Sequence, residues 1–304
     1  MTALDWGPKL AVLAIFMVLA VVAFLRRNWA QVGGKLGRRS KAMSPPSLPA
    51  GFSQVECREI INYMPPADAA RYPDLKTYMR DAAVQTPGIV TIYRVAAFGT
   101  DIEIPAATPH YDRIDAAEAL ALLRELPNPR FILRLHLSDT PSFLDPWSRK
   151  ATGRDDIFHL GTATTLRLVV LYLPDREIVP LIRTVLLHEW VHLLGFKYEL
   201  AVWRFKRANA IEPLPPLPIE PAAASRWRVG MYEPWADFGE KLLGDDEELA
   251  RETALAAPVH AMILWRCLEK AMRKVPKQFA SARLAEFEAR GAFMHREVAL
   301  KARA

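Results

Sequence analysis

The sequence predicts an α+β domain that follows one N-terminal membrane-spanning helix. Three observations predict this class: residues 10–25 form a run without a polar side chain, residues 89–173 mix strand-like and helical patterns, and residues after 233 are helical in pattern. The chain has 304 residues, of which 51% are hydrophobic. That length and composition exclude a disordered chain and a small disulfide scaffold.

Residues 10–25 predict a transmembrane helix. Sixteen apolar residues rise about 24 Å as a helix, and Trp6 and Trp29 flank them at a spacing that suits the two interfaces of a bilayer. Lys9 alone of the basic residues precedes the run, whereas a cleaved signal peptide carries its positive charge there. We therefore expect residues 1–29 to be a membrane anchor with its flanks.

The net charge of +6 is concentrated beside this anchor. Residues 26–41 carry six Lys or Arg and no acid, which leaves 34 basic and 34 acidic residues elsewhere. A nucleic-acid-binding protein needs its positive excess on a binding face, so the charge predicts no nucleic-acid partner. Basic residues accumulate on the cytoplasmic side of membranes. The sequence thus predicts a single-pass protein that contacts lipid through its anchor and has its domain in the cytoplasm.

The next segments predict the α+β domain in order. Residues 30–50 are a basic and Pro/Ser-rich linker. Alternation or continuous apolar runs predict strands, and a period of 3.6 residues predicts helices. In a domain of residues 51–243 we expect helices at 66–82, 114–126 and 180–194, the last ended by Gly195, and strands at 89–98, 131–137 and 165–173.

The remainder of the chain is expected to be helical. A proline-dense stretch at 211–221 predicts an extended crossing segment. Helices are expected at 234–243, 246–256, 258–275 and 277–303, so residues 244–304 form a helical C-terminal extension. Cys57 and Cys267 form no CxxC pair and are expected to be reduced thiols.

The residues His188-Glu189-Trp190-Val191-His192 form an HExxH motif on an expected helix. Histidines four residues apart share one helical face, and two imidazoles at that spacing can bind one Zn²⁺. The glutamate beside the first histidine can accept a proton from a water molecule on the metal. Apolar neighbours predict that this helix is buried, and polar groups inside a buried helix need partners, which a metal ion supplies.

A zinc site needs at least one further protein ligand. Residues 233–237 have the sequence Glu-Pro-Trp-Ala-Asp, an ExxAD pattern at the start of an expected helix. Glu233 and Asp237 lie one turn apart, so one can ligate the metal while the other orients a ligating histidine. Glu240 shares their face and is the reserve ligand. Pro234 predicts that Glu233 lies at the helix cap.

HExxH followed by ExxAD resembles the gluzincin metallopeptidases, particularly membrane-bound CaaX-type and heat-shock-type members, over about residues 165–243. The resemblance implies a zincin-like domain and hydrolysis of peptide bonds in a protein or peptide substrate. It also implies that His188, His192 and Glu233 ligate Zn²⁺, that Glu189 is the general base, and that Asp237 orients a histidine.

Two other interpretations remain open from the sequence. The zinc could be structural, in a membrane adaptor or regulatory sensor without proteolytic activity, and such a site would have a fourth protein ligand. An accidental HExxH would bind no metal. For a donor to the developing oxyanion, the candidates near in sequence are Tyr198, Arg228, Tyr232 and His260.

Overall fold

We describe the protein from a computed structural model. The chain divides into two compact units, Met1–Ser44 and Pro45–Ala304. The structure describes part of the second unit: residues 48–62, 86–106, 109, 111–139, 142–143, 158–214, 229–273, 275 and 284–302. The expected membrane anchor at 1–29, the expected helix at 66–82 and most of the proline-dense stretch lie outside these residues.

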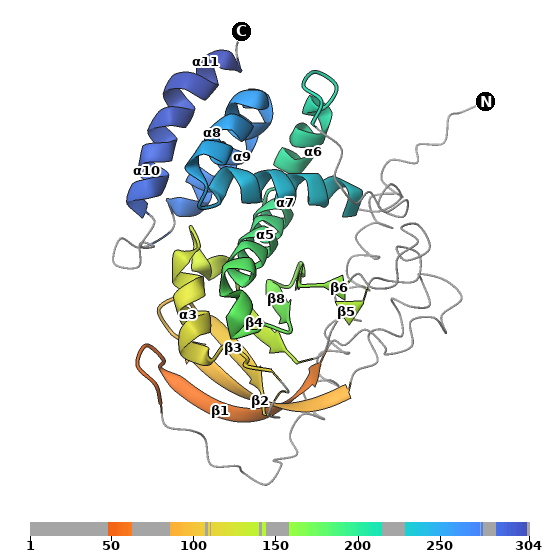
Figure 1. Ribbon diagram of the computed structural model, residues 1–304, viewed down its shortest axis with the longest axis vertical. Coiled ribbons are helices and arrows are strands. Elements are labelled where there is room, and N and C mark those ends of the chain that lie inside the picture. Colours follow the sequence, from red (N-terminus) through yellow and green to blue (C-terminus); the bar gives the residue numbers. More distant parts are fainter. Residues whose placement is uncertain are drawn as a thin grey trace, which may run out of the picture. The chain divides into compact units, whose positions relative to one another are not determined.

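A mixed six-stranded sheet forms the β part of the domain (Figure 1). Its strand order is β1-β2-β3-β4-β8-β7; neighbours are antiparallel except for the parallel pairs β3–β4 and β4–β8. The strands are β1 (Gln54–Asn62), β2 (Thr86–Val95), β3 (Thr100–Pro105), β4 (Arg134–Ser138), β8 (Leu168–Tyr172) and β7 (Gly161–Ala163). Two further strands, β5 (Ser142–Phe143) and β6 (Phe158–His159), pair with each other.

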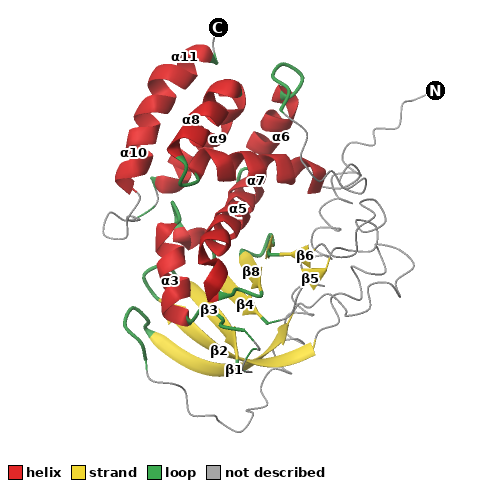
Figure 2. Ribbon diagram, viewed as in Figure 1, coloured by secondary structure: helices red, strands yellow, loops and turns green. Residues whose placement is uncertain are grey.

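All described α-helices except α3, which lies between β3 and β4 in the chain, follow the sheet and form a helical part beside it (Figure 2). Helix α5 starts beside the sheet and runs away from it, and α7 crosses its far end (Figure 1). The helices are α3 (Ala116–Glu125), α5 (Val179–Lys197), α6 (Glu199–Ala208), α7 (Val229–Leu243), α8 (Glu247–Ala256), α9 (Pro258–Met272), α10 (Leu284–Phe293) and α11 (Ala299–Lys301), with a π-helical turn at Met294–Val298. The expected α+β class is therefore confirmed.

One face of the sheet and the helices share a continuous hydrophobic core. Ile102, Leu135 and Leu171 project from neighbouring strands into this core, where residues of α3 and α5 meet them. Strand β8 is buried on both faces, as its continuous apolar run predicts. Alternation in β4 places Leu135 and Leu137 in the core and His136 on the opposite face.

Helix α5 extends beyond the end that the sequence predicts. Gly195 is not its cap, because the helix continues to Lys197. A Cβ at position 195 would lie 3.0 Å from Trp235 Nε1 and 3.1 Å from Tyr232 Cδ1. The glycine thus allows α7 to approach α5 closely, and this packing outweighs its low helix propensity.

Helix α5 and its preceding turn are also long and apolar enough to cross a membrane. Within the described part of the chain, Arg176–Lys197 alone passes that test of length and composition. Core helices of globular proteins pass it as well, and 56% of the apolar window of this helix is buried inside the protein. Apolar side chains of this helix, such as Trp190 and Leu194, are therefore buried against the rest of the protein.

The face of the sheet opposite the main core carries a buried charged cluster. The Glu103 side chain, 3% exposed, accepts a hydrogen bond from Arg134 Nη2 at 3.0 Å and lies 3.3 Å from His136 Nδ1. Burial opposes ionisation of Glu103, but the nearby His136 and the hydrogen bonds from Arg134 outweigh burial and hold its pKa below the ordinary value of 4.5.

Replacing Glu103 by Gln is expected to lower the free energy of unfolding by about 3 kcal/mol at neutral pH, because it leaves Arg134 without its buried partner. The folded-state pKa of Glu103 is depressed, so its contribution is present above pH 4.5 and is lost as the pH falls through the folded-state value. Urea unfolding followed by circular dichroism at neutral and acidic pH measures this difference, which should shrink in acid.

The matched control is Glu56→Gln on β1, which loses only the exposed pair with Arg58 and should change the unfolding free energy by less than about 1 kcal/mol. Equal effects of the two substitutions, or a difference that does not depend on pH, would contradict the assignment.

Candidate metal centre

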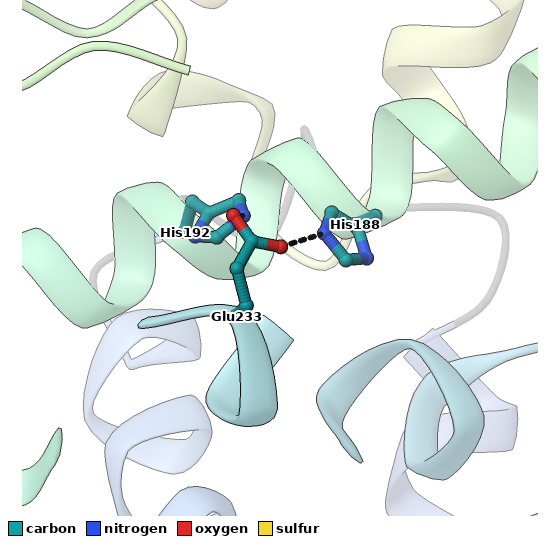
Figure 3. Close-up of side chains that lie close together, drawn as sticks. All are labelled: His188, His192 and Glu233. Carbon is teal, nitrogen blue, oxygen red and sulfur yellow. Dashed lines mark ion pairs between the residues drawn. The ribbon is translucent and has the colours of Figure 1, made fainter. Parts of the chain in front are cut away.

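Helices α5 and α7 bring His188, His192 and Glu233 together (Figure 3). Both imidazoles project from one face of α5, with ring centroids 4.9 Å apart, and Glu233 of α7 points between them. Glu233 Oε2 lies 3.4 Å from His188 Nε2, and Glu233 Oε1 lies 3.4 Å from His192 Nε2. The sequence separates Glu233 from His192 by 41 positions, yet the fold places all three side chains in one group.

The spacing of these atoms fits a metal ion. One potential ligand atom from each of the three side chains lies within 4.8 Å of the other two. In a tetrahedral zinc site with ligands at about 2.0–2.1 Å, neighbouring ligand atoms are about 3.4 Å apart, and each oxygen of Glu233 lies at that distance from one imidazole nitrogen. Two imidazoles and a carboxylate can therefore bind a metal ion at this position.

Access to the group is uneven. The side chain of His192 is 9% exposed and that of Glu233 is 38% exposed. His192 is thus embedded in the core, His188 is 22% exposed, and the carboxylate side faces solvent. A metal ion held here would have protein on one side and an open approach on the other, which a small molecule or an extended chain could use.

The third member of the group lies inside a helix rather than at its cap. Helix α7 starts at Val229, so it passes through Pro234, which the sequence predicted to mark a helix start. Trp235 explains this difference: its side chain is fully buried, and Nε1 donates to the Val191 carbonyl of α5 at 3.0 Å. This tertiary contact outweighs the cost of proline in a helix.

Protonation of the metal-free group follows from its hydrogen bonds. Burial disfavours a charged imidazole, but hydrogen bonds with Glu233 and Glu240 outweigh burial and raise the pKa of His188 to about 10. Burial also opposes ionisation of Glu233, yet hydrogen bonds with His188 and His192 hold the pKa of this carboxyl well below its usual range. Since a metal ligates neutral imidazole, a metal ion and a proton compete for His188.

Glu189 lies beside the group but does not belong to it. It is 6% exposed, and burial raises the pKa of its carboxyl, partly offset by the two neighbouring histidines. The backbone N–H of Ala163 on β7 donates a hydrogen bond to it. Glu189 therefore lies between the imidazoles and the edge strand of the sheet, where it can exchange a proton with a group near the metal position.

The carboxylate that lies beside the second nitrogen of a histidine is Glu240, a place where the sequence predicts Asp237. Glu240 Oε2 lies 2.8 Å from His188 Nδ1, whereas Asp237 Oδ2 accepts from Lys241 Nζ at 2.9 Å. Helical geometry explains the difference: residue 240 is seven positions after Glu233 and rotated from it by about 20°, whereas residue 237 is rotated by about 40°. Glu240 is thus positioned as the histidine's partner rather than as a reserve ligand.

The other imidazole has no such partner. Nδ1 of His192 is buried without a hydrogen-bond partner in the structure as described. Its ring instead stacks on Phe196 at a centroid distance of 6.1 Å, and Phe196 packs edge-on against Tyr232 at 5.0 Å. Aromatic packing therefore fixes the second imidazole, and a carboxylate fixes the first.

The four candidates for an oxyanion donor are placed differently. Tyr232 is buried one residue before Glu233 and reaches the group through Phe196. His260 is fully buried and directs both ring nitrogens elsewhere, Nδ1 to Glu212 Oε2 at 2.8 Å and Nε2 to Asn209 Oδ1 at 2.9 Å. Two further candidates give no support: Tyr198, whose pKa is raised by burial and by nearby Cys267, and Arg228, which lies outside the described residues.

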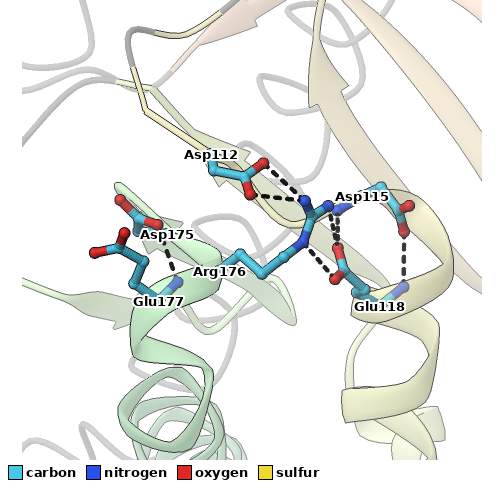
Figure 4. Close-up of polar contacts among 6 residues, drawn as sticks. All are labelled: Asp112, Asp115, Glu118, Asp175, Arg176 and Glu177. Atoms are coloured by element: carbon cyan, nitrogen blue, oxygen red, sulfur yellow. Dashed lines mark hydrogen bonds and ion pairs between the residues drawn. The ribbon is translucent and has the colours of Figure 1, made fainter.

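An ion-pair cluster holds the start of α5 to the rest of the domain (Figure 4). Arg176 lies between two carboxylates: Nη1 donates to both oxygens of Asp112 at 2.8 Å, and Nε donates to Glu118 Oε1 at 2.7 Å. Asp115 caps α3 by accepting from the backbone N–H of Glu118. The cluster joins residues 112–118 to the turn that immediately precedes the helix carrying the histidines.

Sequence reasoning missed the contribution of Gly161. A Cβ at this position of β7 would lie 2.6 Å from Val185 Cγ1 and 2.8 Å from Glu189 Cγ, so only glycine lets the strand lie this close to α5. The signal available in the sequence was a glycine at the start of a short run of small residues, which does not identify the neighbouring helix.

Glu240→Gln is expected to weaken metal binding by about 10–100-fold, because it removes the carboxylate that orients His188. Titration of the full-length chain with Zn²⁺ against a competing chelator measures the change. The matched control is Asp237→Asn on the same helix, which should leave affinity unchanged because its partner is Lys241. A larger loss in the Asp237 variant would restore the assignment made from the sequence.

Gly161→Ala is expected to cost about 1–3 kcal/mol of stability, because β7 or Glu189 must move to admit the methyl group. Thermal unfolding monitored by circular dichroism tests this. Gly291→Ala on α10 is the control: its new methyl group would lie 3.3 Å from Trp265 Cζ2, a less severe approach, and alanine favours the helix. If both variants unfold at the same temperature, β7 does not pack on α5 as closely as described.

The chain matches no protein-family model, and no curated protein or solved structure is significantly similar to it. Support for a metal site at His188, His192 and Glu233 is therefore geometric. Two imidazoles and a carboxylate of an α+β domain have a spacing that can hold a metal ion.

Proposed function

We propose that this protein is a membrane-anchored zinc metalloendopeptidase of the gluzincin type. The observation that carries the proposal is the convergence of His188, His192 and Glu233 with a buried Glu189 alongside. The HExxH and ExxAD patterns of the sequence would then be parts of one site. The apolar run at 10–25 and the basic residues after it support a single-pass anchor with the domain in the cytoplasm.

Zinc is the metal that this donor set favours. Two histidines and one glutamate form the ligand set of several catalytic zinc sites, which keep one position open for water or substrate. Structural zinc sites are closed by a fourth protein ligand. Glu240 does not supply one, since it binds the Nδ1 side of His188, and the exposed side of Glu233 supports an open site.

The reaction proposed is hydrolysis of a peptide bond. A bound zinc ion would polarise the scissile carbonyl and make a water molecule more acidic. Glu189 accepts the proton of the attacking water on its carboxylate and passes it to the leaving amide nitrogen. Burial of Glu189 favours this role, because a carboxyl with a raised pKa holds a transferred proton more readily than an exposed one.

A polypeptide substrate is supported by the position of β7. This strand is the edge of the six-stranded sheet, and β8 is its one partner strand in the described part of the domain. Extended peptides bind to free sheet edges through main-chain hydrogen bonds. Ala163 of this strand contacts Glu189 through its backbone N–H, so a chain added to the edge would lie close to the proposed base.

Glu189→Gln is expected to lower the rate of peptide hydrolysis by about 10²–10⁴-fold while zinc binding persists, because the substitution removes the proton acceptor and leaves the three ligands. The full-length chain is assayed with a quenched-fluorescent peptide library, and zinc is measured by elemental mass spectrometry. His188→Ala should lose both zinc and activity. A Glu189→Gln variant as active as the wild type would refute the mechanism, and an inactive wild type with tightly held zinc would favour a structural role in an adaptor or sensor.

A further inference from the structure

Helix α6 exposes a hydrophobic and basic surface that the proposed peptidase reaction does not use. Leu200, Trp203 and Ile211 are 76%, 50% and 82% exposed. Trp203 is the only aromatic residue among the large hydrophobic side chains that the described part of the chain exposes to this degree. A half-exposed tryptophan near two exposed aliphatic side chains is typical of a surface that binds another molecule or a membrane.

Four exposed residues form one stripe along the helix, and the exposed Ile211 follows in the turn after Ala208. Leu200, Trp203, Arg204 and Arg207 follow the spacing i, i+3, i+4 and i+7, so they share one face. The opposite face is buried: Val202, Phe205 and Ala208 pack into the core against α7 and α9. We call the set Leu200, Trp203, Arg204, Arg207 and Ile211 the α6 stripe.

The chemistry of the α6 stripe fits the headgroup region of a bilayer. Indole rings favour this region because they combine an apolar body with a polar N–H. Arginine side chains can lie along the apolar surface while their guanidinium groups reach lipid phosphates. Lys206, also exposed, adds a third positive charge on α6 against the single acid Glu199. An anionic surface is therefore electrostatically complementary to this helix.

We infer that the α6 stripe lies on the surface of an anionic phospholipid membrane, with Leu200, Trp203 and Ile211 in the interface and Arg204 and Arg207 on lipid phosphates. The sequence supplies a reason for a membrane as the occupant. Residues 26–47 connect the expected anchor to the first described residue, and 22 extended residues reach about 75 Å at most. A domain tethered at that distance meets the bilayer at high effective concentration, so a weak surface contact suffices.

The expected orientation agrees with this assignment. The cytoplasmic leaflet carries the anionic lipids of a cell membrane, and each basic residue near it contributes about fivefold to occupancy. The inference rests on the anchor and orientation of the proposed function but not on its peptidase reaction, because neither the metal group nor Glu189 belongs to the α6 stripe.

A fluorophore on the stripe tests the inference in the full-length chain. Cys57 and Cys267 are replaced by Ala, Leu200 is replaced by Cys, and the new cysteine carries an environment-sensitive fluorophore. The protein is incorporated into vesicles of phosphatidylcholine alone, or of phosphatidylcholine with phosphatidylglycerol, and nitroxide-labelled lipid serves as the quencher. We expect a blue shift and lipid quenching in the vesicles that contain phosphatidylglycerol, both weakened by salt.

Two sets of variants give the control. Replacing Arg204 and Arg207 by Gln should lower the ratio of docked to undocked domain about 25-fold, since each charge contributes about fivefold. The same fluorophore at Leu249→Cys on α8, a leucine 41% exposed, should stay accessible to aqueous iodide. The inference is overturned if iodide quenches the label at position 200 equally in both kinds of vesicle. It is also overturned if, in detergent, the label becomes protected from iodide as the protein concentration rises, which would indicate contact with a second copy of the chain.

Discussion

The close packing of α7 on α5 is the contact on which the candidate metal centre depends. Two histidines on one helix are fixed by local geometry, but the carboxylate reaches them only because α7 lies against the same helix. The Trp235 indole fixes that position by donating to the Val191 carbonyl, one residue before His192. Gly195 leaves space for the indole ring. The three potential ligand atoms therefore come together because of one hydrogen bond, from Trp235 to Val191, and because Gly195 has no side chain.

The charges of the acids and histidines in the centre compensate one another. Glu189, Glu233 and Glu240 surround two imidazoles, so three acids share a region whose burial disfavours charge. Without a metal, a proton on His188 compensates part of this charge, which accounts for its raised pKa. A divalent cation would supply the same compensation more strongly. The site and its surroundings are therefore consistent with an excess of acid that a cation neutralises.

The sequence predicted the helix of His188 and His192 because periodicity and spacing along one helix are local properties. It also identified Glu233, although it placed this residue at a cap, since nothing local shows that Trp235 draws α7 over the proline. The sequence could not show that Glu240 rather than Asp237 lies beside His188, because that depends on the angle between two helices. Gly161 lies on a strand and Glu189 on a helix, so no pattern within either segment could predict their close contact. The anchor expected at 1–29 and the expected helix at 66–82 lie outside the described residues and stay predictions.

The late position of Glu233 in the chain has a consequence for how the centre forms. Two histidines one turn apart can bind a metal ion weakly as soon as α5 is helical. The third ligand, Glu233, is in position only when α7 has packed on α5. Any ion held tightly by all three side chains would therefore also hold α5 and α7 together. Loss of the ion and separation of the two helices would be one event, so the occupancy of the centre would report on the folding of the helical half of the domain.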